Sequence, residues 1–105
     1  MKIIKMIVGY IEEELEGAED YAKKAILYKD EHPELARTFY EMSLQEMHHV
    51  DMMHAEVVKM IEKHRREKGD PPAMMLSIWE YHHERHIEEA KEIRILQAEY
   101  RSAGD

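Results

Sequence analysis

The stretch QEMHHVD at residues 45–51 lies inside a long helical pattern and contains Glu46 and His49, three residues apart. On an α-helix this spacing places both side chains on one face, one turn apart. At about 100° per residue, Glu46 lies near the centre of an apolar stripe and His49 within about 60° of it. A carboxylate there is costly unless it is paired or binds a metal, so the pattern predicts a functional pair. The stripe consists of Leu35, Phe39, Met42, Val50, Met53, Val57 and Met60.

The composition predicts one small all-α domain. The chain has 105 residues, of which 44% are hydrophobic and 36% charged, and strand-like alternation is absent. A net charge of −8 argues against nucleic acid or an anionic membrane as a main partner. No apolar run approaches membrane-spanning length, and the first residues turn acidic too quickly for a signal peptide. We therefore expect a cytoplasmic protein.

Cysteine is absent, which excludes disulfides, thiolate catalysis, zinc ribbons and rubredoxin-type iron sites. The chain has 8 histidines and 23 acidic residues, so the available metal ligands are nitrogen and oxygen atoms. Such ligands suit iron, manganese or zinc.

Three helices are expected, over residues of about 2–30, 34–67 and 73–101. Pro33 suits the first position of the second helix, and basic residues followed by Gly69 end that helix. Asp70 is the expected N-cap of the third helix. The first helix has the apolar stripe Ile4, Val8, Ile11, Leu15, Ala18, Ala22 and Ala25. The third has Met75, Leu76, Trp79, Ile87, Ala90, Ile93 and Tyr100, with His82, His83 and His86 on or beside it.

The short connection at Pro33 makes the first two helices an antiparallel hairpin. The distance of each candidate ligand from the turn then shows whether the ligands can meet. Glu14 lies about 24 Å before the turn along its helix. Glu46 and His49 lie about 20–24 Å after it. The three side chains are therefore expected to meet at the same height.

These residues resemble the ferritin-like superfamily, most closely its rubrerythrin-type and encapsulated-ferritin branches. Those proteins have a glutamate in the first helix, a tyrosine seven residues later, and Glu-x-x-His in the second helix, often opened by Pro-Glu-Leu. Here the corresponding residues are Glu14, Tyr21, Glu46 and His49, with Pro33 opening the second helix. The resemblance covers roughly residues 10–60. It implies a di-iron ferroxidase that oxidises Fe(II) with dioxygen or peroxide, with Tyr21 donating a hydrogen bond to a ligand carboxylate.

Ligand counting predicts a site shared between two chains. A ferritin-like di-iron centre takes a Glu from each of two helices and a Glu-x-x-His from each of two more. Glu14, Glu46 and His49 are half of that set, and a two-fold homodimer, or a multiple of dimers, would supply the rest. A four-helix bundle would then form from two hairpins, with the third helix outside. The rival is a site within one chain that uses Glu80 and His83. We disfavour it because Glu80 lies about 100° around the helix from Trp79, and therefore off the apolar stripe of the third helix.

Several alternatives remain open at this level. Glu46 and His49 could be a buried polar pair that fixes helix register. The protein could be a rubrerythrin-like peroxidase that depends on an outside electron donor, or a non-catalytic metal-stabilised dimerisation module. His82, His83 and His86 are either packing residues or a second metal site. The acidic residues that could steer Fe(II) inward are Glu13, Glu16 and Glu19.

The resemblance also raises an encapsulin shell as a partner and an encapsulin compartment as a location. Encapsulated ferritins usually end in a short Gly-, Ser- and Leu-containing cargo peptide. Residues 98–105 do not look like one.

Overall fold

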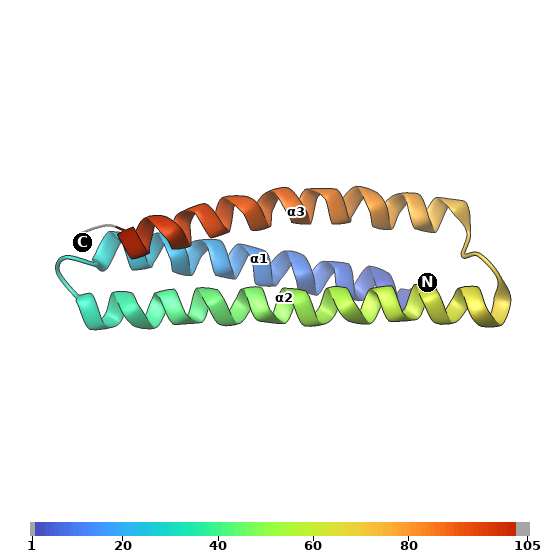
Figure 1. Cartoon of the computed structure of the whole chain (residues 1–105), viewed down its shortest axis with the longest axis horizontal. Helices are drawn as coiled ribbons and strands as arrows, with labels where there is room; N and C mark the ends of the chain where they lie inside the picture. Colours follow the sequence, from blue (N-terminus) through green and yellow to red (C-terminus); the bar gives the residue numbers. More distant parts are fainter. Residues whose placement is uncertain (1, 103–105) are drawn as a thin grey trace.

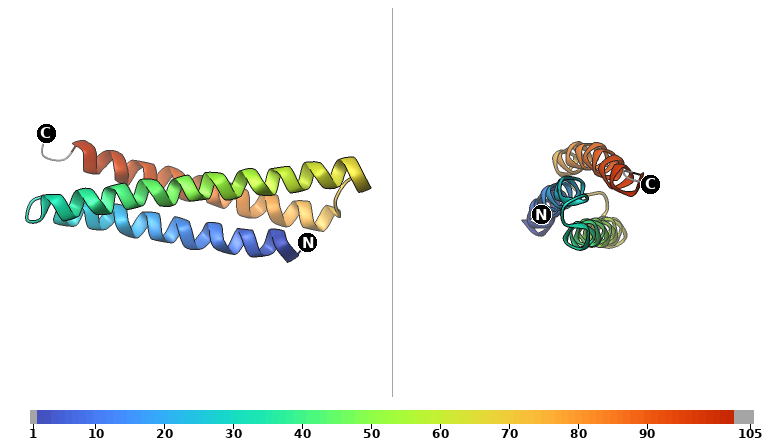
Figure 2. Two further views of the ribbon diagram at one scale, coloured as in Figure 1. Left: turned by 90° about the horizontal axis from the view of Figure 1, so that it is seen from below. Right: turned by 90° about the vertical axis from the view of Figure 1, so that its left-hand side faces the viewer.

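The computed structural model describes residues 2–102, which form three long helices joined by two short connections (Figure 1). These are α1 (Lys2–Tyr28), α2 (Pro33–Lys68) and α3 (Ala73–Ser102). Consecutive helices are antiparallel, so α1 and α3 run in the same direction. Seen end-on, the three helices stand at the corners of a triangle in a rod of 56 × 18 × 18 Å (Figure 2). The all-α prediction is confirmed for the described part of the chain, which contains no strand.

The connections lie where the sequence predicts them. Pro33 is the first residue of α2, where its missing N–H leaves no helical hydrogen bond unmade. At the other end of α2, Gly69 adopts φ 81°, a conformation that favours glycine, and its N–H donates to the Arg65 carbonyl over 3.2 Å. The predicted N-cap role of Asp70 is wrong. Helix α3 begins three residues later, at Ala73, and the Pro72 carbonyl accepts from the N–H groups of Met75 and Leu76. Asp70 instead pairs with Arg65 at 3.3 Å.

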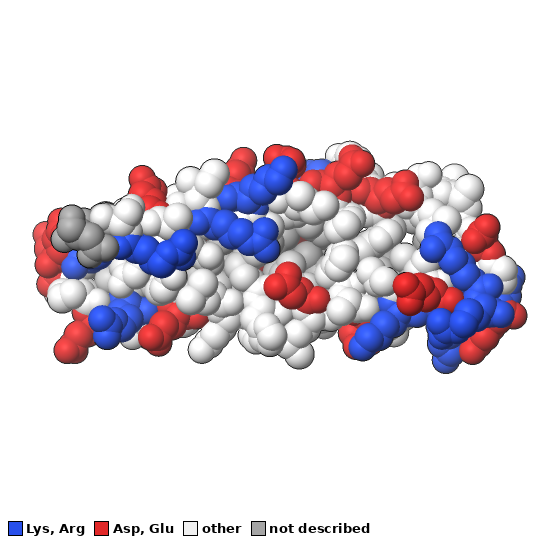
Figure 3. Space-filling model, in the orientation of Figure 1, with Lys and Arg blue, Asp and Glu red and all other residues white. Residues whose placement is uncertain are grey.

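Charged side chains are spread over the face drawn in Figure 3, and basic groups gather where α2 ends. None of the helices within residues 2–102 is long and apolar enough to cross a membrane.

The stripe predicted for α1 is buried as expected. Ala18, Ala22 and Ala25 are completely buried, which lets the neighbouring helices approach closely. A buried polar chain then joins all three helices at this level. Gln97 of α3 donates to the Ser43 hydroxyl over 3.0 Å, and Ser43 donates to the Ala18 carbonyl over 2.7 Å.

The stripe predicted for α2 is only partly correct. Val50 and Val57 are buried, but Leu35 is 45% exposed and Phe39, Met42, Met53 and Met60 are half-buried. The core side of α2 is instead rotated toward the seam with α3, because α2 packs against two helices rather than one. Its buried residues are Ala36, Ser43, Met47, Val50, Val57 and Ile61.

Helix α3 also differs in part from its predicted stripe. Trp79, Ala90 and Ile93 are buried, whereas Ile87 is 41% exposed. Two polar residues take up core positions on this helix, His86 and Gln97. His86 follows the predicted stripe, whereas Gln97 was not predicted; it is buried because its side chain donates to the Ser43 hydroxyl.

Candidate metal centre

Glu14 of α1 and Glu46 and His49 of α2 come together midway along the hairpin. His49 Nδ1 lies 3.2 Å from Glu14 Oε2 and 3.9 Å from Glu46 Oε1. One potential ligand atom from each residue lies within 4.8 Å of the others. We call these three residues the hairpin cluster. The antiparallel register therefore places the three side chains at one height, as the distances from the turn predict.

Gly17 makes room for this cluster, a role that the sequence pattern did not reveal. A Cβ atom at this position would lie 3.2 Å from Glu46 Oε2. Such a separation is tighter than ordinary van der Waals contact, so any larger residue would press on the carboxylate. The close packing of the α1 backbone against Glu46 could only have been predicted from the hairpin register.

The two carboxyl groups of the hairpin cluster have opposite pKa shifts. A hydrogen bond to Glu14, followed by burial, raises the pKa of Glu46 to about 7. The same hydrogen bond lowers the pKa of Glu14, and His49 lowers it further. Opposite shifts of this kind are expected of two carboxyl groups that share one proton, with Glu46 as the protonated partner. Two carboxylates and an imidazole converging in this way fit a divalent cation, which would replace the proton and relieve the repulsion.

The hairpin cluster faces away from α3. On α2, Tyr40 stacks on Tyr100 of α3 with ring centroids 4.6 Å apart. Glu46 and His49 lie about 120° and 180° from Tyr40 around the helix. In the single chain their side chains are 25% and 46% exposed, and that of Glu14 is 24% exposed. The expectation that Glu46 sits at the centre of a buried stripe is thus corrected: it lies at the edge of the core.

Apolar side chains surround the hairpin cluster on this side of α1 and α2, which we call the open face. Phe39 stacks on Tyr21, with ring centroids 6.1 Å apart. Tyr21 makes no hydrogen bond to the hairpin cluster in the structure, so its role as a donor to a ligand carboxylate stays a prediction. The other members of the open face are exposed or half-buried: Tyr10, Leu35, Met42, Met53 and Met60.

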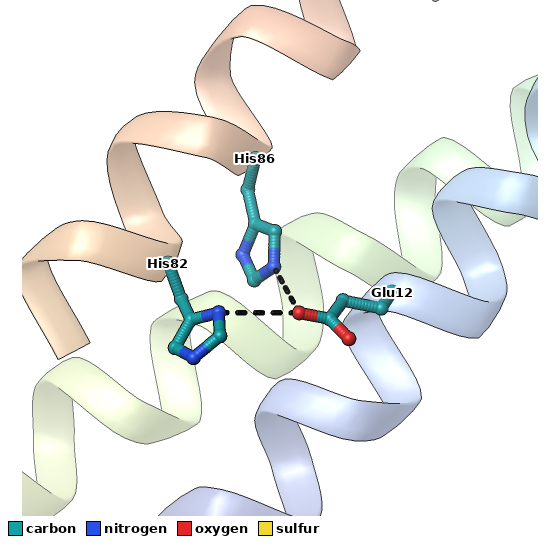
Figure 4. Close-up of side chains that lie close together, drawn as sticks. All are labelled: Glu12, His82 and His86. Atoms are coloured by element: carbon teal, nitrogen blue, oxygen red, sulfur yellow. Dashed lines mark ion pairs between the residues drawn. The ribbon is translucent and has the colours of Figure 1, made fainter. Parts of the chain in front are cut away.

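Two of the three helix-three histidines singled out by sequence meet a glutamate of α1 (Figure 4). His82 Nδ1 lies 3.2 Å from Glu12 Oε1, and His86 Nε2 lies 3.7 Å from the same oxygen. We call these three residues the α3 cluster. Burial lowers the pKa of His86, although Glu12 opposes this shift. Glu12 was not identified from the sequence, because only the packing of α3 against α1 brings it to the histidines.

His83 points elsewhere. Its ring stacks on His54 of α2 at 4.4 Å and on Trp79 at 5.5 Å, which makes it a packing residue at the α2–α3 seam. Glu80 is exposed and belongs to neither ligand cluster found within residues 2–102. The rival site based on Glu80 and His83 is therefore not assembled in this structure.

The acidic residues considered for metal entry are spread around α1. Glu13 and Glu16 are exposed, and Glu19 pairs with Lys23 at 3.1 Å. Burial raises the pKa of Glu89 on α3, and the charges of Glu16 and Glu19 add to this effect. These two residues thus lie on the α3 side of α1 rather than beside the hairpin cluster.

Comparison of the chain with protein-family models, with curated proteins and with solved structures found no match. The resemblance to the ferritin-like superfamily therefore stays a prediction.

Proposed function

We propose that this protein is a ferroxidase whose di-iron site forms between two copies of the chain. The observation that carries the proposal is the hairpin cluster: two carboxylates and one imidazole that converge on a solvent-facing surface of the hairpin. A di-iron site of the four-helix type needs four carboxylates and two imidazoles. One chain offers half of these ligands, and a two-fold axis through the open face would bring the other half.

The surroundings of the hairpin cluster support a second copy as the occupant of the open face. Half-buried Phe39, Met42, Met53 and Met60 flank the cluster along α2 and would be covered in a dimer. Helix α3 packs on the other side of the hairpin and leaves this face accessible (Figure 2). Two hairpins joined face to face would make a four-helix bundle, with both copies of α3 outside it.

Fe(II) is the substrate in this proposal. Two Fe(II) ions each lose one electron, and dioxygen takes up the two electrons and two protons to leave as hydrogen peroxide. With peroxide as oxidant, the same two electrons and two protons break its O–O bond and yield two water molecules. Carboxylate and imidazole ligands suit both Fe(II) and Fe(III), so the site can hold substrate and product.

The residues of the hairpin cluster would have different roles as metal ligands. Glu46 would bridge the two metal ions, and Glu14 and His49 would each hold one. Binding of the metal would displace the proton held between Glu14 and Glu46. The released carboxylates then stabilise the higher charge of Fe(III).

The test is an aerobic Fe(II) titration followed by the ferric absorbance. A fast phase of about one iron per chain, or two per dimer, is expected from the ligand count. The Glu46→Ala, His49→Ala double variant should lose this phase. A Glu41→Ala, His48→Ala variant is the matched control, because it removes the same residue types from exposed positions on α2.

The other outcomes separate the rival functions. A fast phase of two irons per chain that persists in a His82→Ala, His86→Ala protein would place the site within each subunit and contradict the shared centre. Faster turnover with peroxide than with dioxygen would indicate a peroxidase. Metal binding without oxidation would indicate a structural metal in a dimerisation module, and neither binding nor oxidation would leave Glu46 and His49 as a register pair.

A further inference from the structure

We propose that Glu12, His82 and His86 form a second metal site, mononuclear and complete within one chain. It binds a divalent transition metal ion, of which zinc and Fe(II) are the candidates. The α3 cluster lies about 200° around α1 from the hairpin cluster, because Glu12 and Glu14 are two residues apart. It is therefore separate from the proposed ferroxidase site and does not depend on it.

The first argument is the buried imidazole of His86. This residue is 5% exposed, and its Nε2 atom has no hydrogen-bond partner. Glu12 Oε1 lies 3.7 Å away, which is too long for a hydrogen bond. Buried polar atoms without partners are rare in folded proteins, and such an atom aimed at a carboxylate and a second imidazole is explained by a ligand between them.

The second argument is the arrangement of the donor atoms. His82 and His86 are four residues apart, so they project from one face of α3, and Glu12 approaches from α1 (Figure 4). Zinc with nitrogen and oxygen ligands at about 2.0–2.1 Å requires neighbouring ligand atoms to be about 3.0–3.5 Å apart. The observed separations from Glu12 Oε1 are 3.2 and 3.7 Å. The three donor atoms all lie within 4.8 Å of one another, so side-chain rotations would bring them to an ion between them.

The donor set indicates the class of metal. Two imidazoles and one carboxylate favour zinc, Fe(II), cobalt or nickel over magnesium and calcium, which prefer oxygen ligands. Three protein ligands leave at least one coordination position for water or another small molecule. The side chains of Glu12 and His82 are 47% and 30% exposed, so this position can reach solvent.

Metal binding here would fasten α3 to α1. The ligands come from the first half of each helix, the same half of α3 in which Trp79 is buried. An ion bridging Glu12 to two histidines one turn apart would fix both the height and the rotation of α3 on α1.

The experiment uses Co²⁺, whose visible absorption reports nitrogen and oxygen coordination. The titration is carried out on the Glu46→Ala, His49→Ala protein, so that the hairpin cluster does not contribute. We expect about one Co²⁺ per chain, competed away by Zn²⁺, because the donor set is mononuclear. Substituting His82→Ala and His86→Ala in this protein should abolish the absorption.

Two further variants distinguish loss of the metal site from misfolding and from a general loss of histidines. Glu12→Gln leaves His86 and the core unchanged and should weaken Co²⁺ binding by about tenfold or more, since it removes the charged ligand. His32→Ala with His48→Ala removes two exposed histidines and should have no effect. The proposal is overturned if the parent binds no Co²⁺, or if binding survives both Glu12→Gln and the His82, His86 substitutions. In that case the three side chains form only an ion-pair contact.

Discussion

The two sides of α1 present similar ligands in opposite settings. Toward α2, the hairpin cluster has two carboxylates and one imidazole, and its His49 side chain is 46% exposed. Toward α3, the α3 cluster has one carboxylate and two imidazoles, and its His86 side chain is 6% exposed. Under our proposals the first supplies half of the ligands of a binuclear site, whereas one chain supplies all protein ligands of the second, in which Glu12 and His82 are 47% and 30% exposed. Under these proposals, helix α1 separates a site completed by a second chain from a site completed within one chain.

Disrupting the open face should have the largest effect. Met42→Lys places a charge among the apolar side chains that flank Glu46, and burying an unpaired charge in an interface costs several kcal/mol. We expect monomers by light scattering and at least about a tenfold loss of fast Fe(II) oxidation, since each site would lose half of its ligands.

The matched control is Met52→Lys, because Met52 is 55% exposed and lies elsewhere on α2. It should leave both the dimer and oxidation unchanged. Co²⁺ binding at the α3 cluster should survive in both variants. A monomeric Met42→Lys protein that oxidises Fe(II) at the original rate would show that no partner is needed.

Zinc bound at the α3 cluster should raise the free energy of unfolding of the protein. In the Glu46→Ala, His49→Ala protein, zinc at about 100 times its Kd adds about 2.7 kcal/mol to the free energy of unfolding. For a domain of this size that corresponds to a rise in Tm on the order of 10 °C. The measurement is thermal unfolding followed by circular dichroism, with and without zinc.

Glu12→Gln in the same protein should remove most of this rise in Tm. An equal rise in the Glu12→Gln protein would mean that zinc binds elsewhere. Such a result would remove the contrast between the two clusters.

Gly17→Ala tests how closely the hairpin cluster is packed. The new methyl group would lie 3.2 Å from Glu46 Oε2 and should displace that carboxylate. Fe(II) affinity is expected to fall about tenfold, the size of effect seen when groups that orient metal ligands are altered.

Gly9→Ala is the control for this substitution, because a Cβ there has no neighbour within 4 Å. It should raise stability by about 1 kcal/mol through helix propensity and leave iron binding unaltered. Equal iron affinity in the Gly17→Ala and Gly9→Ala proteins would show that Glu46 does not need its present position.

The smallest expected effect concerns pH at the α2–α3 seam. Burial, followed by the charge of His83, lowers the pKa of His54, whereas Asp51 opposes the shift; Trp79 also packs on His54. The folded state therefore prefers neutral His54, and unfolding takes up a proton. Stability should be complete above the unfolded pKa of about 6.5 and fall as pH decreases below it.

His54→Phe should reduce this loss of stability between pH 7 and pH 5, because a phenyl ring keeps the stacking and cannot be protonated. The comparison is of Tm at the two pH values, with His48→Phe as the exposed control. An unchanged pH dependence in His54→Phe would assign the loss of stability to other groups.

The helices and the hairpin cluster could be predicted from the sequence because they depend on local signals. Pro33 and Gly69 mark helix ends, and Glu46 with His49 share a face through their spacing alone. The length of each helix arm then brings Glu14 to the same height. None of these inferences requires knowledge of where α3 packs.

What sequence reasoning missed depends on α3. Its rotation decides that Gln97 enters the core, that His83 turns toward His54, and that Glu12 becomes a neighbour of His82. The same packing moves the buried side of α2 away from Met42 and Met60. Side-chain periodicity gives the faces of a helix but does not give its rotation against two partners at once.

The most direct test of the shared site is native mass spectrometry of the His82→Ala, His86→Ala protein loaded with Fe(II) without oxygen. This variant retains the hairpin cluster as the one cluster proposed to take up iron. We predict a dimer that carries two iron ions, because each chain supplies half of the ligands. A monomer that carries iron, or a dimer that carries none, would contradict a di-iron site formed between two chains.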